Sequence, residues 1–160
     1  MNVFFLSRDV KECAEAHCDK HVVKMILECA QLLSTAHHVL GTSVSEDKIY
    51  KKTHVNHSTA VWVRESQYHY RYVYDLMLAL GNEYTKRYNK THLTITKMKL
   101  PLFHLPNDIP KTPWQDPPQC LPDEYKRSET TVAYMLYYNH KADQWAAGGS
   151  PMKWYGETNE

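Results

Sequence analysis

The sequence predicts an all-α protein, a compact single-domain bundle of three main helices with a long proline-rich irregular segment and an aromatic C-terminal tail. Glycine is scarce, with 5 residues in 160, and no alternating runs rich in Val and Ile favour a sheet. Two long stretches without proline carry apolar residues at helical spacing. Seven of the 8 prolines lie between residues 101 and 122, where regular structure is not expected. The domain is residues 1–160, with 156–160 expected to fray.

Residues 19–40 are expected to form the helix around which the rest is organised. Asp19 suits an N-cap, and Gly41 suits a helix end. Most of the circumference is apolar, which is typical of a buried helix. One narrow polar line, with members three or four residues apart, consists of His21, Lys24, Glu28, Gln31 and Thr35. Because buried Lys and Glu are rare unless paired or lining a cavity, we interpret this line as one wall of a polar pocket. The alternative is a solvated face with an ordinary Lys24–Glu28 pair.

The remaining elements follow from capping residues and breakers. The expected elements are an extended apolar segment over 3–6, a short helix over 9–17 with Asp9 as its N-cap, a long helix over 58–88, one helical turn near 102–105 and a helix over 128–145 with Ser128 as its N-cap. Gly81 is a possible kink in the long helix. The tyrosines of that helix are expected to pack with their hydroxyls at the surface.

The net charge and the cysteines limit the functions and cellular compartments that the sequence supports. The formal net charge of +1 gives weak support for nucleic-acid binding. A folded basic face remains open, because the following residues all fall between residues 48 and 99: Lys48, Lys51, Lys52, Lys86, Arg87, Lys90, Lys97 and Lys99. Four cysteines without a C-x-x-C pair predict a reducing cytoplasm. The only N-terminal apolar segment, residues 3–6, is too short for a signal sequence or membrane span.

Two groups of residues are candidates for catalysis or metal binding. Glu28 beside Lys24 and His21 suits an acid, a base or a stabiliser of a cation. A histidine and cysteine cluster comprises Cys13, His17, Cys18 and His21. These are zinc ligand types, but the spacing matches no standard zinc motif, so we predict no metal and no cofactor.

Two further groups leave alternatives open. Asn56 and His57 precede a predicted helix, where such side chains either cap the helix or bind a phosphate. Trp154 and Tyr155, with Lys153 beside them, either stack on nucleic-acid bases or strap the tail onto the core.

These residues together resemble a known family. Asp19-Lys20, Lys24, Glu28 and Gln31-Leu32-Leu33, followed by Asn56-His57, Trp62 and a tyrosine-rich helix, resemble the pyrimidine-dimer DNA glycosylase superfamily, which includes phage endonuclease V-type enzymes. The second half, with Pro122-Asp123-Glu124, a helix from Ser128 and Lys153-Trp154-Tyr155-Gly156, resembles the same family. The similarity to small uncharacterised phage homologues is greater than that to the characterised glycosylases.

The resemblance implies an all-helical fold, with the N-terminus against the first long helix, and a DNA glycosylase with AP-lyase activity on damaged or modified pyrimidines. In that family an N-terminal α-amine attacks the sugar C1′, forms a Schiff base and cleaves the strand by β-elimination. Here the implied nucleophile is the amine of Met1, and the implied carboxylate is Glu28. An α-amine, with a pKa of about 8, is a free nucleophile more often than lysine near neutral pH.

The substrate-binding residues assigned by resemblance and residue chemistry are Arg8, Lys20, His21, Lys24, Gln31, Asn56, His57, Trp62, Trp154 and Tyr155. The expected partner is damaged double-stranded DNA, in the host-cell cytoplasm if the chain is phage-encoded. One alternative is an enzyme acting on a free nucleotide or modified base in the same pocket. Another is a non-catalytic phage protein that binds a nucleotide or sequesters a host factor.

Overall fold

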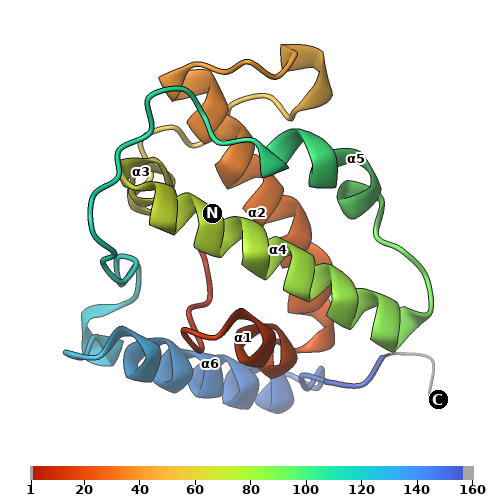
Figure 1. Cartoon of the computed structure of the whole chain (residues 1–160). Helices are drawn as coiled ribbons and strands as arrows, with labels where there is room; N and C mark the ends of the chain where they lie inside the picture. Colours follow the sequence, from red (N-terminus) through yellow and green to blue (C-terminus); the bar gives the residue numbers. More distant parts are fainter. Residues whose placement is uncertain (1, 157–160) are drawn as a thin grey trace.

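The computed structural model describes residues 2–156 and is all-helical over that range, with six α-helices, two short 3-10 helices and no strand. The helix α2 (Asp19–Leu40) lies at its centre and packs most extensively on α4 (Gln67–Tyr88). It also contacts α3 (Ser58–Glu65) and α5 (Leu93–Phe103), while α6 (Thr130–Ala147) lies below with α1 (Val10–Ala16) (Figure 1). The central position follows from the apolar circumference of α2, where Val22, Ile26 and Leu33 are fully buried.

The ends of α1 and α2 follow from capping residues, with one correction. The Asp9 carboxylate accepts a hydrogen bond from the Glu12 N–H at 2.9 Å, as predicted. Gly41 ends α2 with φ +95°, and its N–H donates to the His37 carbonyl. Asp19 as the N-cap of α2 was wrong: Cys18 holds that position, and Asp19 is a buried first helical residue.

The expected continuous helix over residues 58–88 is broken at Ser66. This residue has extended backbone angles and caps α4, because its hydroxyl oxygen accepts a hydrogen bond from the Tyr68 N–H at 3.2 Å. The same hydroxyl donates to the Thr112 carbonyl at 2.6 Å. The interruption therefore attaches the proline-rich segment to the junction between α3 and α4.

Gly81 lies inside α4 and faces α5. A Cβ at this position would be 2.7 Å from Cγ1 of Ile95, closer than real Cβ contacts. The glycine therefore permits the close approach of α4 and α5.

The tyrosines of α4 hold neighbouring segments with buried hydroxyls. Tyr70, Tyr72 and Tyr74 are at most 6% exposed. Their hydroxyls donate to the carbonyls of Leu102, Ser7 and Lys99. The expectation of surface hydroxyls was wrong for these three residues, because distant carbonyls supply the partners that a buried hydroxyl requires.

The second half of the chain contains two elements that differ from the prediction. The helix α5 includes Pro101 in its last turn and is longer than the single turn expected there. The helix α6 begins at Thr130 with Glu129 in the N-cap position, so Ser128 is not its N-cap. Between them the chain runs along the side of the bundle (Figure 1), apart from the short helix η2 (Asp123–Tyr125). A second short helix, η1 (Glu46–Lys48), lies in the loop after α2.

Residues 3–6 form a non-helical segment that is buried throughout. Phe4 stacks on His21 of α2 with ring centroids 4.5 Å apart. Phe5, 1% exposed, contacts the rings of Tyr72 and Trp114. The start of the described chain is thus part of the core. Within residues 2–156, no helix is long and apolar enough to cross a membrane.

Candidate functional site

The polar line of α2 is divided between the interior and solvent. The Glu28 side chain is 15% exposed, whereas that of Lys24, one turn earlier, is 69% exposed. The Lys24 ammonium lies 3.8 Å from the Glu28 carboxylate. Gln31 is half-buried. The carboxylate therefore lies at the border between the core and the exposed edge of α2, next to a cation in water.

His21 lies in an aromatic enclosure below Glu28. It is 6% exposed, between the rings of Phe4 and Trp145. The Tyr138 hydroxyl accepts a hydrogen bond from the Cys18 N–H at 2.8 Å and is hydrogen-bonded to His21 Nδ1, also at 2.8 Å. Burial lowers the pKa of His21 to about 3. His21 is therefore neutral near pH 7.

The first described residues connect this enclosure to the start of α3. The Asn2 side chain donates to the Cys120 carbonyl at 3.1 Å and accepts a hydrogen bond from the Tyr134 hydroxyl at 3.0 Å. Cys120 in turn lies 3.6 Å, sulfur to hydroxyl oxygen, from Thr59 in the first turn of α3. Met1, the residue expected to supply the nucleophile, lies outside the described residues.

The N-terminal segment and α2 run in opposite directions (Figure 1). Phe4 contacts α2 at His21, and Asn2 lies beside the start of α3. The loop before α3 contacts α2 higher up, where the Thr53 N–H donates to the Thr35 hydroxyl at 3.1 Å. Glu28 stands midway between His21 and Thr35 on the same side of the helix.

Asn56 and His57 lie at the start of α3 in different environments. His57 caps the helix, because its Nδ1 accepts a hydrogen bond from the Thr59 N–H at 3.1 Å. Desolvation lowers the pKa of His57, which favours the neutral, capping form. Asn56 is exposed at a cavity of about 460 Å³ that also contacts Trp62 and Asp116.

Arg8 and Trp62 belong to an aromatic cluster that the sequence did not reveal. The Arg8 guanidinium lies 3.7 Å from the centroid of Trp114, and Trp62 meets the same ring at 5.5 Å. Trp62 is 3% exposed, stacks on His69 and donates its indole N–H to the Gln115 carbonyl. The proline-rich segment thus supplies Trp114 to this cluster.

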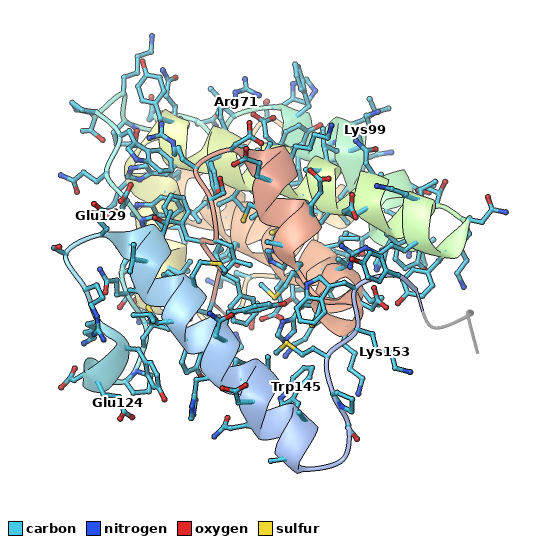
Figure 2. The ribbon with its side chains drawn as sticks, turned by 90° about the horizontal axis from the view of Figure 1, so that it is seen from below. Arg71, Lys99, Glu124, Glu129, Trp145 and Lys153 are labelled. Carbon is cyan, nitrogen blue, oxygen red and sulfur yellow. The ribbon has the colours of Figure 1, made fainter. Side chains whose placement is uncertain are left out.

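The aromatic tail has one attached residue and one exposed residue. The Trp154 indole N–H donates to the Ala16 carbonyl at 2.9 Å, while Tyr155 is 82% exposed. Nearby, a cavity of about 300 Å³ lies between the start of α2 and residues 149–153. Lys20 lines it with its ammonium 5.7 Å from the Trp145 ring. Figure 2 shows Trp145 on α6 and Lys153 on the segment that follows.

A buried ion pair joins four segments beside this cavity. Arg87 donates to the Asp19 carboxylate at 3.0 Å and to the His17 carbonyl at 2.8 Å, and it also pairs with Glu83. Its side chain is 5% exposed, so Arg87 does not contribute to the basic face to which the sequence assigned it. The Gly156 N–H donates to the other Asp19 oxygen at 2.7 Å. Asp19 therefore links α2, α4 and the tail through its carboxylate.

The histidine and cysteine cluster is packed in the core. His17 is fully buried, with Nδ1 2.6 Å from the Cys13 carbonyl, and the Cys13 thiol donates to the Phe4 carbonyl. In the part of the chain that the structure describes, no group of three or more His, Cys, Asp or Glu residues is placed to hold a metal ion.

Acid is expected to destabilise the protein through three buried histidines. Burial lowers the pKa of His17 to about 4, that of His21 to about 3 and that of His37 to about 4, from 6.5. The unfolded chain therefore takes up protons first as the pH falls below 6.5, and stability is lost progressively down to about pH 3. The loss in unfolding free energy, measured by urea titration across that range, should be on the order of 3 kcal/mol or more.

Two variants test this assignment. His37→Gln removes one buried titrating group and should make the pH dependence shallower. His54→Gln, at an exposed position, should leave it unchanged. An identical pH dependence in His37→Gln and the wild type would contradict the role of His37.

Comparison of the chain with protein-family models, curated proteins and solved structures finds no match.

Proposed function

We propose that this protein is a DNA glycosylase with associated AP-lyase activity, acting on damaged or modified pyrimidines in duplex DNA. The observation that carries the proposal is the position of Glu28, a carboxylate only 15% exposed on the helix against which the buried N-terminal segment packs. A carboxylate held at such a border is suited to stabilise a cationic sugar and to move protons.

The proposed reaction uses the amine of Met1 as the nucleophile and the Glu28 carboxylate for proton transfer. The unprotonated amine of Met1 attacks the sugar C1′, and the bond from C1′ to the base breaks, with its electron pair leaving on the base. Glu28 accepts a proton from the attached amine and passes a proton to O4′ as the bond from C1′ to O4′ breaks, which opens the sugar ring and gives the protonated Schiff base. Removal of a C2′ proton breaks the bond from C3′ to the phosphate oxygen, and water hydrolyses the Schiff base to free the amine.

The surroundings of Glu28 support this division of roles. Lys24 and Lys20 are exposed on the same edge of α2, where ammonium groups suit phosphates. His21 is neutral, so it adds no positive charge beside Glu28. In the proposal, Lys20 and Lys24 bind the DNA backbone, and His21 positions the N-terminal segment through Phe4.

Borohydride trapping tests the proposal directly. Full-length protein incubated with duplex DNA containing an abasic site and borohydride should form a covalent adduct. Glu28→Gln should lower the rate of adduct formation by roughly 100-fold or more, because proton transfer and charge stabilisation are lost together. Acetylation of the N-terminal amine should abolish the adduct.

The matched control is Glu15→Gln, an exposed glutamate on α1 that should leave trapping unchanged. Thermal unfolding of both variants separates chemistry from folding. An adduct that forms at wild-type rate in Glu28→Gln, or after N-terminal acetylation, would rule out the proposed mechanism.

The cavity beside Trp145 favours a second candidate, binding or turnover of a free nucleotide or modified base. Its volume of about 300 Å³, an indole wall and Lys20 suit a small aromatic anion. Salt separates the candidates, because duplex binding weakens steeply with salt and nucleotide binding to a single lysine does not.

A further inference from the structure

We infer that α5 is a second DNA-contacting element, which presses an apolar ridge against a locally distorted duplex while flanking lysines bind its phosphates. The ridge consists of Leu93, Leu100 and Phe103, which are 63%, 79% and 54% exposed. These three side chains lie on one side of α5, with Lys97 on one flank and Lys99 on the other. The choice of DNA as the partner rests on the proposed function.

The exposure of the ridge is a fixed property of the fold. The opposite face of α5 is buried through Thr94, Met98 and Leu102. Hydroxyls of α4 hold the end of the helix, since Tyr74 donates to the Lys99 carbonyl at 2.6 Å and Tyr70 to the Leu102 carbonyl at 2.7 Å. A rigid helix that presents three large apolar side chains to water marks an interaction surface.

The charge around the ridge selects an anionic partner. Residues 84–107 contain five Lys and Arg side chains and no Asp or Glu. Arg87 is buried in its ion pair with Asp19, but the four lysines of this stretch are exposed: Lys86, Lys90, Lys97 and Lys99. Figure 2 shows Lys99 and Arg71 at one edge of the molecule and Glu124 and Glu129 at another. The stretch 84–107 is therefore locally cationic, although the net charge of the whole chain is only +1.

A cleft beside the ridge extends the basic surface. It has a volume of about 810 Å³ between α5 and the loop that contains η1. Its lining includes Lys48, Lys97 and His104, together with Tyr50 and Leu100. The ridge is therefore bordered by a groove with two lysines against one aspartate, Asp47, and this polar groove suits a phosphate backbone better than the continuous apolar plane that a bilayer favours.

The ridge is physically connected to the helix that carries Glu28. His92 caps α5, and its Nδ1 accepts a hydrogen bond from the Thr94 N–H. Its Nε2–H therefore donates to the Val23 carbonyl of α2, 3.2 Å away. Val23 and Leu27 are exposed on α2 at 37% and 39%, so apolar and basic surface continues from α5 to the edge of Glu28.

Apolar side chains inserted between base steps stabilise a bent or unstacked duplex, and lysines contribute a salt-dependent attraction that is independent of sequence. Replacing the lysines should therefore change the salt dependence of binding, whereas replacing the apolar residues should change the preference for a distorted duplex.

The experiment measures binding of the full-length protein to a short duplex, intact or with a tetrahydrofuran abasic analogue, across a range of salt concentrations. The analogue has no aldehyde and forms no Schiff base, so binding is measured apart from chemistry. Lys97→Gln with Lys99→Gln should reduce the slope of log K against log salt by about 2 for either duplex. Leu100→Ala with Phe103→Ala should keep the slope and lower affinity for the analogue duplex roughly ten-fold, removing the preference for it.

Matched controls lie on other faces. Lys126→Gln with Lys141→Gln, near η2 and on α6, should leave the slope unchanged, and Val132→Ala with Leu136→Ala, also exposed on α6, should leave the preference unchanged. No duplex binding by the wild type, or wild-type behaviour of both α5 variants, would overturn the inference. Binding to phosphatidylserine vesicles that depends on Leu100 and Phe103, with duplex binding unaffected by them, would also overturn it. If both α5 variants behave as expected but no adduct is trapped on natural abasic DNA, the inference holds and the proposed glycosylase fails.

Discussion

Arg87→Met is expected to lower the free energy of unfolding by about 3–5 kcal/mol, the range found when one partner of a buried ion pair is removed. The substitution leaves the Asp19 carboxylate, 2% exposed, without its guanidinium. It also removes the donors to the carbonyls of His17 and Glu15. Urea unfolding followed by circular dichroism measures the loss.

Two further variants test whether the loss of stability comes from the buried ion pair itself. Arg127→Met makes the same chemical change at an exposed position and should cost at most about 0.5 kcal/mol. Asp19→Asn combined with Arg87→Met removes the buried charge as well and should recover part of the stability lost in Arg87→Met alone. A loss below about 1 kcal/mol in Arg87→Met would show that the ion pair contributes little to stability.

Phe5→Ala is expected to cost about 3–5 kcal/mol, because it leaves a cavity in a region that cannot close around it. Phe5 is 1% exposed, and its ring centroid lies 5.4 Å from that of Tyr72 and 6.1 Å from that of Trp114. Thermal or urea unfolding measures the loss. Phe103→Ala is the matched control, since the same ring is 54% exposed there and should contribute little to stability.

The Phe5 variant also bears on the proposed function. Loss of the ring releases the segment that leads to Met1, so borohydride trapping should fall further than the folded fraction of Phe5→Ala accounts for. Phe5→Leu refills part of the cavity and should restore both stability and trapping in large part. Trapping that falls only in proportion to unfolding would show that the packing of Phe5 does not position the amine.

Local signals were sufficient to predict some elements. The apolar circumference of residues 19–40 and the stop at Gly41 predicted α2, and Asp9 predicted the start of α1. These signals act within one or two helical turns, so sequence alone contains them. Within the helix expected over residues 58–88, the helical assignment of residues 67–88 was confirmed for the same reason.

Long-range partners account for the errors. Ser66 breaks the helix because Thr112, 46 residues later, accepts its proton. Asp19 is buried because Arg87, 68 residues later, pairs with it, and neither residue shows this in its neighbourhood. The buried hydroxyl of Tyr70 finds the Leu102 carbonyl 32 residues away. At the candidate site, the sequence identified Glu28 and His21 but not Trp114, Tyr138 or the ridge on α5, whose roles depend on tertiary contacts.

The contacts that Asp19 makes with Arg87 and with the tail bear on folding during translation. Its backbone N–H donates to the Lys153 carbonyl at 2.6 Å, and its carboxylate receives Gly156 and Arg87. A nascent chain on the ribosome can form α1, α2 and α4 early, yet the junction between α1 and α2 waits for residues synthesised more than 130 positions later. Until then Asp19 has Arg87 of α4 as a partner but lacks its hydrogen bonds with Lys153 and Gly156, so this junction is completed only after the tail has been synthesised.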